Sequence, residues 1–170
     1  MKKVNLVYFQ HDLRIHDHPG LTAASQHGLP IIGVYLFNPI ELENTAFGFQ
    51  RMGLFRLQFL YESLRDLKDN LAKLNIPLFV FNRETTLAAN VLKSAYEIHA
   101  IYAAVEPGRD EQVLLKAFQF ELSVTTLVLH HDKALISPSD YPWLLKQLPG
   151  RFTDARIKIE ASIHVRPLIS

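Results

Sequence analysis

The feature that most constrains the fold is a regular alternation between short apolar segments and longer amphipathic ones. The short segments are rich in β-branched and aromatic residues, as buried strands are, and the longer ones space their apolar residues by threes and fours, as helices do. Strands and helices that alternate in this way are typical of a parallel sheet covered on both faces. The predicted strands are Val4–Phe9, Ile31–Phe37, Leu78–Phe81, Ala100–Val105 and Val124–Leu129.

Short connections and right-handed crossovers leave few arrangements for five such strands. We therefore predict an α/β fold, a Rossmann-like doubly wound five-stranded parallel sheet with the strand order 3-2-1-4-5. A first helix is expected to begin at Pro19, whose fixed φ suits a first helical turn. The other predicted helices are Gln50–Asn75, Thr86–Glu97 and Arg109–Leu122.

Length and composition indicate one domain with a buried core, because the chain has 170 residues of which 48% are hydrophobic. We expect residues 1–131 to form this domain. Residues 132–170 are rich in helix breakers and are expected to be a linker or tail. The apolar residues of this tail would either fold back on the domain or form an interface, most simply that of a homodimer. They include Tyr141, Trp143, Leu144, Leu145 and Phe152.

Charge and cysteine content exclude several classes of protein. Eighteen Lys and Arg against seventeen Asp and Glu leave a formal charge of +1, so we expect no strong nucleic-acid binding by this domain alone. The absence of Cys excludes disulfides and thiolate sites and fits a reducing compartment. No stretch approaches the roughly 18 apolar residues that span a bilayer. We expect a cytoplasmic protein without a membrane segment.

A polar loop follows the first predicted strand, where α/β sheets usually bind their ligands. It carries Asp12, Arg14, His16 and His18. These residues either contribute to a site or serve the structure alone, with Asp12 and Arg14 pairing with each other or tying down the loop. The two histidines suggest a metal, but the chain offers no Cys and no HExxH motif, so no metal is predicted.

Glu106 follows the fourth predicted strand and precedes Pro107, so helix capping explains it less well than ligand contact does. The common phosphate-binding and nucleophile motifs, GxGxxG, GxxxxGK[ST] and GxSxG, do not occur. The residues alone therefore leave two interpretations open. One is a binding or regulatory module for a nucleotide-like ligand or a partner protein, and the other, less favoured, is an independent enzyme.

Three segments resemble the DNA photolyase/cryptochrome family, with the greatest likeness to its cryptochrome-DASH branch. Tyr8–Leu21 is similar to the family pattern W-F-R-x-D-L-R-x-x-D-N-x-x-L, and Phe47–Leu64 resembles F-G-F-x-K-T-G-x-x-R-x-x-F-L-x-E-S-L. Leu148–Glu160 is similar to the linker pattern L-P-x-x-F-T-x-F-R-K-x-V-E. The resemblance implies the N-terminal α/β domain of this family. The helical domain that holds FAD, and with it light-driven DNA repair or blue-light signalling, is absent from the chain, which is expected to be inactive alone.

The resemblance also implies an antenna chromophore, commonly a reduced folate such as methenyltetrahydrofolate. Glu106 matches the carboxylate that hydrogen-bonds the pterin ring, and Gln10, Phe37 and Arg51 are further candidate contacts. Gln10 stands where the family usually has Arg, Arg51-Met52 replaces Lys-Thr, and Ala155 replaces the linker Phe. Because Gln10 lacks the charge of Arg, we expect folate binding to be weak. No catalytic residue is assigned.

Overall fold

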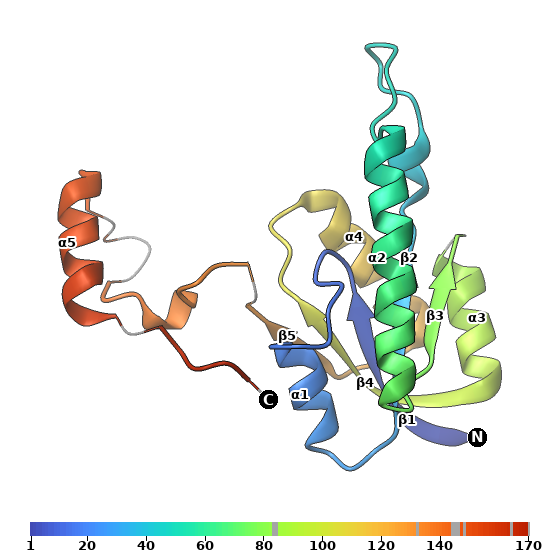
Figure 1. Ribbon diagram of the computed structural model, residues 1–170. Helices are drawn as coiled ribbons and strands as arrows, with labels where there is room; N and C mark the ends of the chain where they lie inside the picture. The colour runs from blue at the N-terminus through green and yellow to red at the C-terminus, as the bar shows by residue number, and fades with distance from the viewer. Residues whose placement is uncertain (83–84, 132, 144–146, 148, 164, 170) are drawn as a thin grey trace.

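A computed structural model describes residues 1–82, 85–131, 133–143, 147, 149–163 and 165–169. Five parallel strands form one sheet in the order β3-β2-β1-β4-β5, which confirms the predicted topology (Figure 1). The strands are β1 (Lys2–Phe9), β2 (Ile31–Leu36), β3 (Leu78–Phe81), β4 (Tyr96–Ala104) and β5 (Leu127–His130). The helices are α1 (Pro19–Ser25), η1 (Pro39–Leu42), α2 (Leu54–Lys73), α3 (Thr85–Ala95), α4 (Arg109–Leu122), η2 (Pro138–Asp140) and α5 (Phe152–Ser162).

The alternation of side chains along β1 separates two cores. Val4, Leu6 and Tyr8 face α3 and α4, whereas Val7 and Phe9 face α1 and α2. Successive strand residues point to opposite faces, so burial on both sides requires the continuous apolar run that the sequence shows. The Leu repeat of α2 serves this packing, because Leu64, Leu67 and Leu71 are its buried residues.

Two helix predictions were wrong at their ends. Tyr96 and Glu97 belong to β4 and not to the preceding helix, because they pair with Lys2 and Lys3 of β1, and sheet pairing overrides local helix propensity. Residues 50–53 precede α2, and Gln50 instead forms an antiparallel bridge with Asn44.

The tail contains a helix that the sequence did not predict. Helix α5 has no buried residue and stands apart from the layered domain in Figure 1, with Phe152 83% exposed. The rings of Tyr141 and Trp143 contact each other in a tilted arrangement with centroids 6.0 Å apart, whereas Leu144 and Leu145 lie outside the described residues. Among the helices of the described ranges, none has both the length and the apolar character needed to cross a membrane.

Candidate functional site

The carboxyl edge of the sheet collects the polar residues that the sequence singled out. Gln10 follows β1, Phe37 follows β2, Glu106 follows β4 by two residues, and His130 ends β5. Parallel pairing brings these strand ends together, since Phe9 lies opposite Tyr35 and Ala104 lies opposite His130. This edge is where doubly wound sheets bind ligands.

Glu106 is a buried carboxylate with one cationic neighbour in the described part of the chain. Its residue is 6% exposed, and its Oε1 lies 2.7 Å from Nζ of Lys133. The Glu106 main-chain carbonyl accepts a hydrogen bond of 2.8 Å from Nε2 of Gln112, which ties the loop to α4. Val105 continues the sheet by donating its N–H to the His130 carbonyl. The backbone at Glu106 is therefore held by both neighbouring elements, and the side chain is paired with Lys133.

Two hollows flank Glu106. The larger, about 300 Å³, lies between the β1, β4 and β5 ends and α4, and the smaller, about 240 Å³, lies toward the segment after β5. Apolar and polar residues both line the larger hollow, as they do in small-molecule sites. Its lining is Gln10, Ala104, Val105, Glu106, Glu111, Gln112, Leu115, Lys116, Leu127 and Leu129.

Gln10 is buried beside the same hollow. Its residue is 7% exposed, and its backbone N–H donates to Oδ1 of Asp12 at 2.9 Å. The side-chain Nε2 has no hydrogen-bond partner among the described residues. A buried donor without a partner is costly, so an amide in this position favours a bound acceptor.

A third hollow of about 160 Å³ lies on the other side of Gln10, against α2. Arg56 and Tyr35 line it together with Gln10. Burial, with Glu41 nearby, raises the pKa of Tyr35 to about 12 despite the opposing charge of Arg56. The Tyr35 hydroxyl therefore keeps its proton as a donor at neutral pH.

The other two predicted contacts lie outside the linings of the described cavities. Phe37 is half-buried and packs edge-on against Tyr35, with ring centroids 5.2 Å apart. Arg51 is exposed, and its backbone N–H donates to the Glu43 carbonyl. The structure thus brings Gln10 and Glu106 to one cavity, whereas Arg56 and not Arg51 provides the guanidinium at the third.

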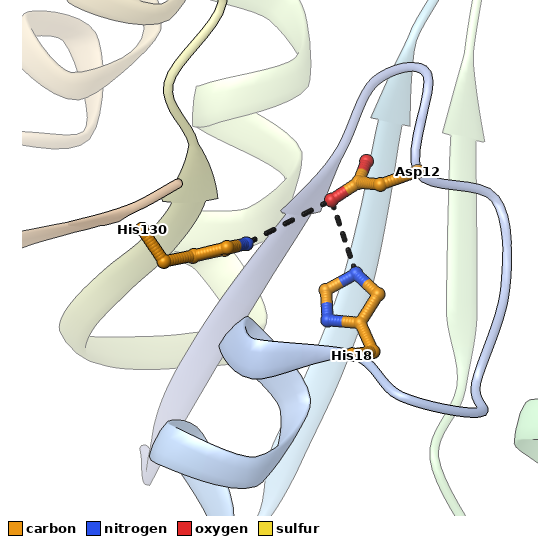
Figure 2. A group of neighbouring side chains, drawn as sticks. All are labelled: Asp12, His18 and His130. Carbon is orange, nitrogen blue, oxygen red and sulfur yellow. Dashed lines mark ion pairs between the residues drawn. The ribbon is translucent and has the colours of Figure 1, made fainter. Parts of the chain in front are cut away.

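A buried cluster lies next to this site. Figure 2 shows His18, at the start of α1, and His130, at the end of β5, both directed at one carboxylate oxygen of Asp12. Oδ2 of Asp12 lies 3.0 Å from Nε2 of His18 and 3.9 Å from Nε2 of His130. Burial raises the pKa of the Asp12 carboxyl, but hydrogen bonds from His18 and the Gln10 N–H outweigh it and hold the pKa below its ordinary value.

The cluster has the residue types of a metal site, but the ring nitrogen of His18 that would bind a metal carries a proton. The ligand atoms of Asp12, His18 and His130 all lie within 4.8 Å of one another. However, Nδ1 of His18 accepts a 3.0 Å hydrogen bond from the Leu21 N–H, so the proton of the neutral ring sits on Nε2 and points at Asp12. A metal at Nε2 would move that proton to Nδ1 and break this helix cap. The geometry is that of a hydrogen-bonded network.

Arg14 ties down the loop, as one of the two interpretations predicted. Its Nε donates to the His16 carbonyl at 3.1 Å, and its Nη2 donates to the Asp17 carbonyl at 2.9 Å. Asp12 pairs with His18 and not with Arg14.

Two residues at the site, Lys133 and His130, were not predicted from the sequence. Both belong to the part of the chain that follows α4. His130 ends a parallel strand and so shares the edge with Gln10 and Glu106; applying the carboxyl-edge rule to all five strands would have found it. Lys133 follows this edge by three residues in an irregular segment, and no motif marks it.

Comparisons with known proteins agree with this architecture. The chain is 32% identical to the cryptochrome DASH of Gloeobacter violaceus over 167 residues, covering 97% of this chain and 33% of that protein. A crystal structure of the Synechocystis cryptochrome superposes with a TM-score of 0.87 at 29% identity, covering 97% of this chain and 35% of that one. An archaeal photolyase from Sulfolobus tokodaii shares the fold at 21% identity and a TM-score of 0.72, covering 98% of this chain and 36% of that one. That structure is described with two FAD molecules and an implied novel light-harvesting cofactor.

The chain therefore spans about a third of the length of these relatives. The family described as DNA photolyase matches residues 5–167, which include all five strands except the first three residues of β1, and the edge that carries Glu106. With its α/β fold and strand order, the chain belongs to the DNA photolyase family and resembles the N-terminal α/β domain of the cryptochrome-DASH proteins.

Proposed function

We propose that this domain binds an antenna chromophore, a reduced folate of the methenyltetrahydrofolate type, at the carboxyl edge of its sheet. Glu106 is the principal anchor and Gln10, which lines the same cavity, is a further contact. Phe37 and Arg51 are contacts by the resemblance alone, since they lie outside the linings of the described cavities. The observation that carries the proposal is a buried carboxylate between two hollows of about 300 and 240 Å³. An aminopyrimidinone ring offers two parallel N–H donors, and a carboxylate accepts such a pair with strong directionality.

Orientation is what a light-harvesting group requires, since energy transfer depends on how donor and acceptor are placed. The loop holding Glu106 is fixed by Gln112 and by the Val105–His130 pairing, and the carboxylate is paired with Lys133, so the backbone that carries the anchor is set before a ligand arrives. The Sulfolobus tokodaii relative is described with two FAD molecules and an implied novel light-harvesting cofactor, which supports a light-harvesting ligand for this fold but not a folate in particular.

The activity of the complete family is a separate proposal. By the resemblance, FAD binding and light-driven DNA repair or blue-light signalling belong to the part of the relatives that this chain does not span. We expect these 170 residues to be inactive alone and to carry no stoichiometric flavin. The family match across residues 5–167 favours this antenna role over an unrelated regulatory module on the same scaffold.

A titration with methenyltetrahydrofolate, followed by its absorbance and fluorescence, tests the proposal. Glu106→Gln keeps the size of the side chain but loses the charge, and we expect it to weaken binding about tenfold or more. Glu160→Gln, on exposed α5, is the matched control and should leave the affinity unchanged. Equal affinities for wild type and Glu106→Gln would remove Glu106 from the site, and no binding to wild type would refute the folate assignment.

A further inference from the structure

Lys133 lies at the Glu106 site, and neither the motifs nor the resemblance explains its presence there. We propose that Lys133 is a second anchor of this site, which selects a ring carrying a lactam edge, an N–H next to a C=O. The inference rests on the proposed function, because it concerns the ligand that Glu106 binds.

The geometry places opposite charges side by side at the smaller cavity. Nζ of Lys133 lies 2.7 Å from Oε1 of Glu106, and the Lys133 side chain is 36% exposed whereas that of Glu106 is 6% exposed. Both residues line the smaller hollow, together with Val105, Pro107, Gln112, His131, Ala134 and Ile136. The ammonium therefore covers the carboxylate while keeping access to the space in which a ligand would lie.

The pair has unused hydrogen-bonding capacity. An ammonium group carries three donors and a carboxylate offers about four acceptor positions, so one ion pair exhausts neither. A ligand that meets both groups must present a donor to Glu106 and, next to it, an acceptor to Lys133. A cyclic lactam has this pattern: its N–H faces the carboxylate and its carbonyl oxygen faces the ammonium. Pterin and isoalloxazine rings both carry such an edge.

Burial argues that Lys133 assists binding and does not block it. A carboxylate that is 94% removed from solvent is costly without a counter-ion, and a ligand that is a neutral ring supplies none. Lys133 provides this charge before and after binding. If Lys133 were instead a plug that the ligand must displace, its removal would tighten binding, which is the opposite result.

The experiment compares two ring systems that differ at C4 and at N3, where pterin has an N–H donor and 2,4-diaminopteridine has an acceptor. The N3 difference concerns Glu106 and is the same for every variant, so the change in the affinity ratio on replacing Lys133 reports the contact at C4. Pterin has an oxygen acceptor at C4, whereas 2,4-diaminopteridine has an amino donor there, which would oppose the ammonium. The affinities of both are measured by fluorescence titration for wild type, Lys133→Met, Lys133→Arg and the exposed control Lys158→Met. We expect the ratio of pterin to diaminopteridine affinity to fall about tenfold in Lys133→Met, since hydrogen bonds to charged groups have this order of strength. In Lys133→Arg the affinity ratio should stay close to that of wild type, and in Lys158→Met it should be unchanged.

The outcomes separate this inference from the proposed function. If wild type binds neither ring, the folate site and the role of Lys133 are both refuted. If wild type binds pterin but the ratio is the same in Lys133→Met, or if Lys133→Met binds pterin more tightly, the folate site stands and the role of Lys133 is refuted.

Thermal unfolding gives a readout without ligand: Lys133→Met should lower Tm, and adding Glu106→Gln should restore part of the loss. A Tm loss that the second substitution leaves unchanged would show that the two side chains do not interact.

Discussion

The backbone N–H of Gln10 donates to Oδ1 of Asp12 at 2.9 Å, and this bond connects the candidate ligand site to the buried His18 network. Asp12 receives hydrogen bonds on both sides, so the loop after β1 has a fixed path despite its polar sequence. The side chain of Gln10 is thereby held at the edge of two cavities. The network positions the site and is not itself the site.

Replacing Asp12 by Asn should destabilise the domain by about 2 kcal/mol at pH 7, because hydrogen bonds to a buried charge are lost. The folded-state pKa of Asp12 lies below its ordinary value of 3.8, so its contribution is fully present above that value and is lost as the pH falls through the folded pKa. The difference between wild type and Asp12→Asn should therefore shrink from pH 7 toward pH 2. Denaturant unfolding across this range measures it, and a constant difference would contradict the role of the charge.

His18 has two functions that substitution can separate. It caps α1 through Nδ1 and hydrogen-bonds Asp12 through Nε2. Asn is a good helix cap but is too short to reach Asp12, whereas Ala can do neither. We expect His18→Ala to lose about 1 kcal/mol more stability than His18→Asn, as measured by urea unfolding. Equal losses would show that the cap contributes nothing.

Much of the fold could be predicted from the sequence, because each buried strand needs apolar residues on both faces, as Ile31–Leu36 shows. The start of β4 could not be predicted, because Tyr96–His99 alternates polar and apolar residues and becomes a strand only by pairing with β1. Glu106 could be found because the carboxyl ends of parallel strands share an edge, whereas Gln10 became a candidate only through the resemblance. The pairing of Lys133 with Glu106 depends on where the segment after β5 runs, which local sequence does not encode.

Gly20 makes room for the two imidazole rings. A Cβ added there would lie 2.6 Å from Cε1 of His130 and 3.1 Å from Cε1 of His18. Gly20→Ala should therefore displace His130 and cost about 1–3 kcal/mol, although Ala ordinarily favours a helix. Gly53→Ala is the matched control, because nothing lies within 4 Å of the added atom. A Gly20→Ala variant as stable as the control would mean that the rings rearrange freely.

The tail is predicted to associate with a second copy of the chain. Phe152 is 83% and Ile157 55% exposed on α5, a helix without a buried residue, and exposed apolar faces tend to mark interfaces. Light scattering over a concentration series should show a monomer–dimer equilibrium that Phe152→Ser with Ile157→Ser weakens. A strict monomer at all concentrations, with a tail that protease cleaves freely, would contradict this.

The central claim is that the carboxyl edge around Glu106 binds the chromophore, and chemical-shift mapping tests it most directly. Uniformly ¹⁵N-labelled protein is titrated with methenyltetrahydrofolate. We predict that the largest backbone amide shifts occur at Gln10, Val105, Glu106, Gln112 and Leu129, which line the larger cavity, while α5 and the amino ends of the strands stay unchanged. Saturable shifts confined to another surface, or no shifts at millimolar ligand, would contradict the account.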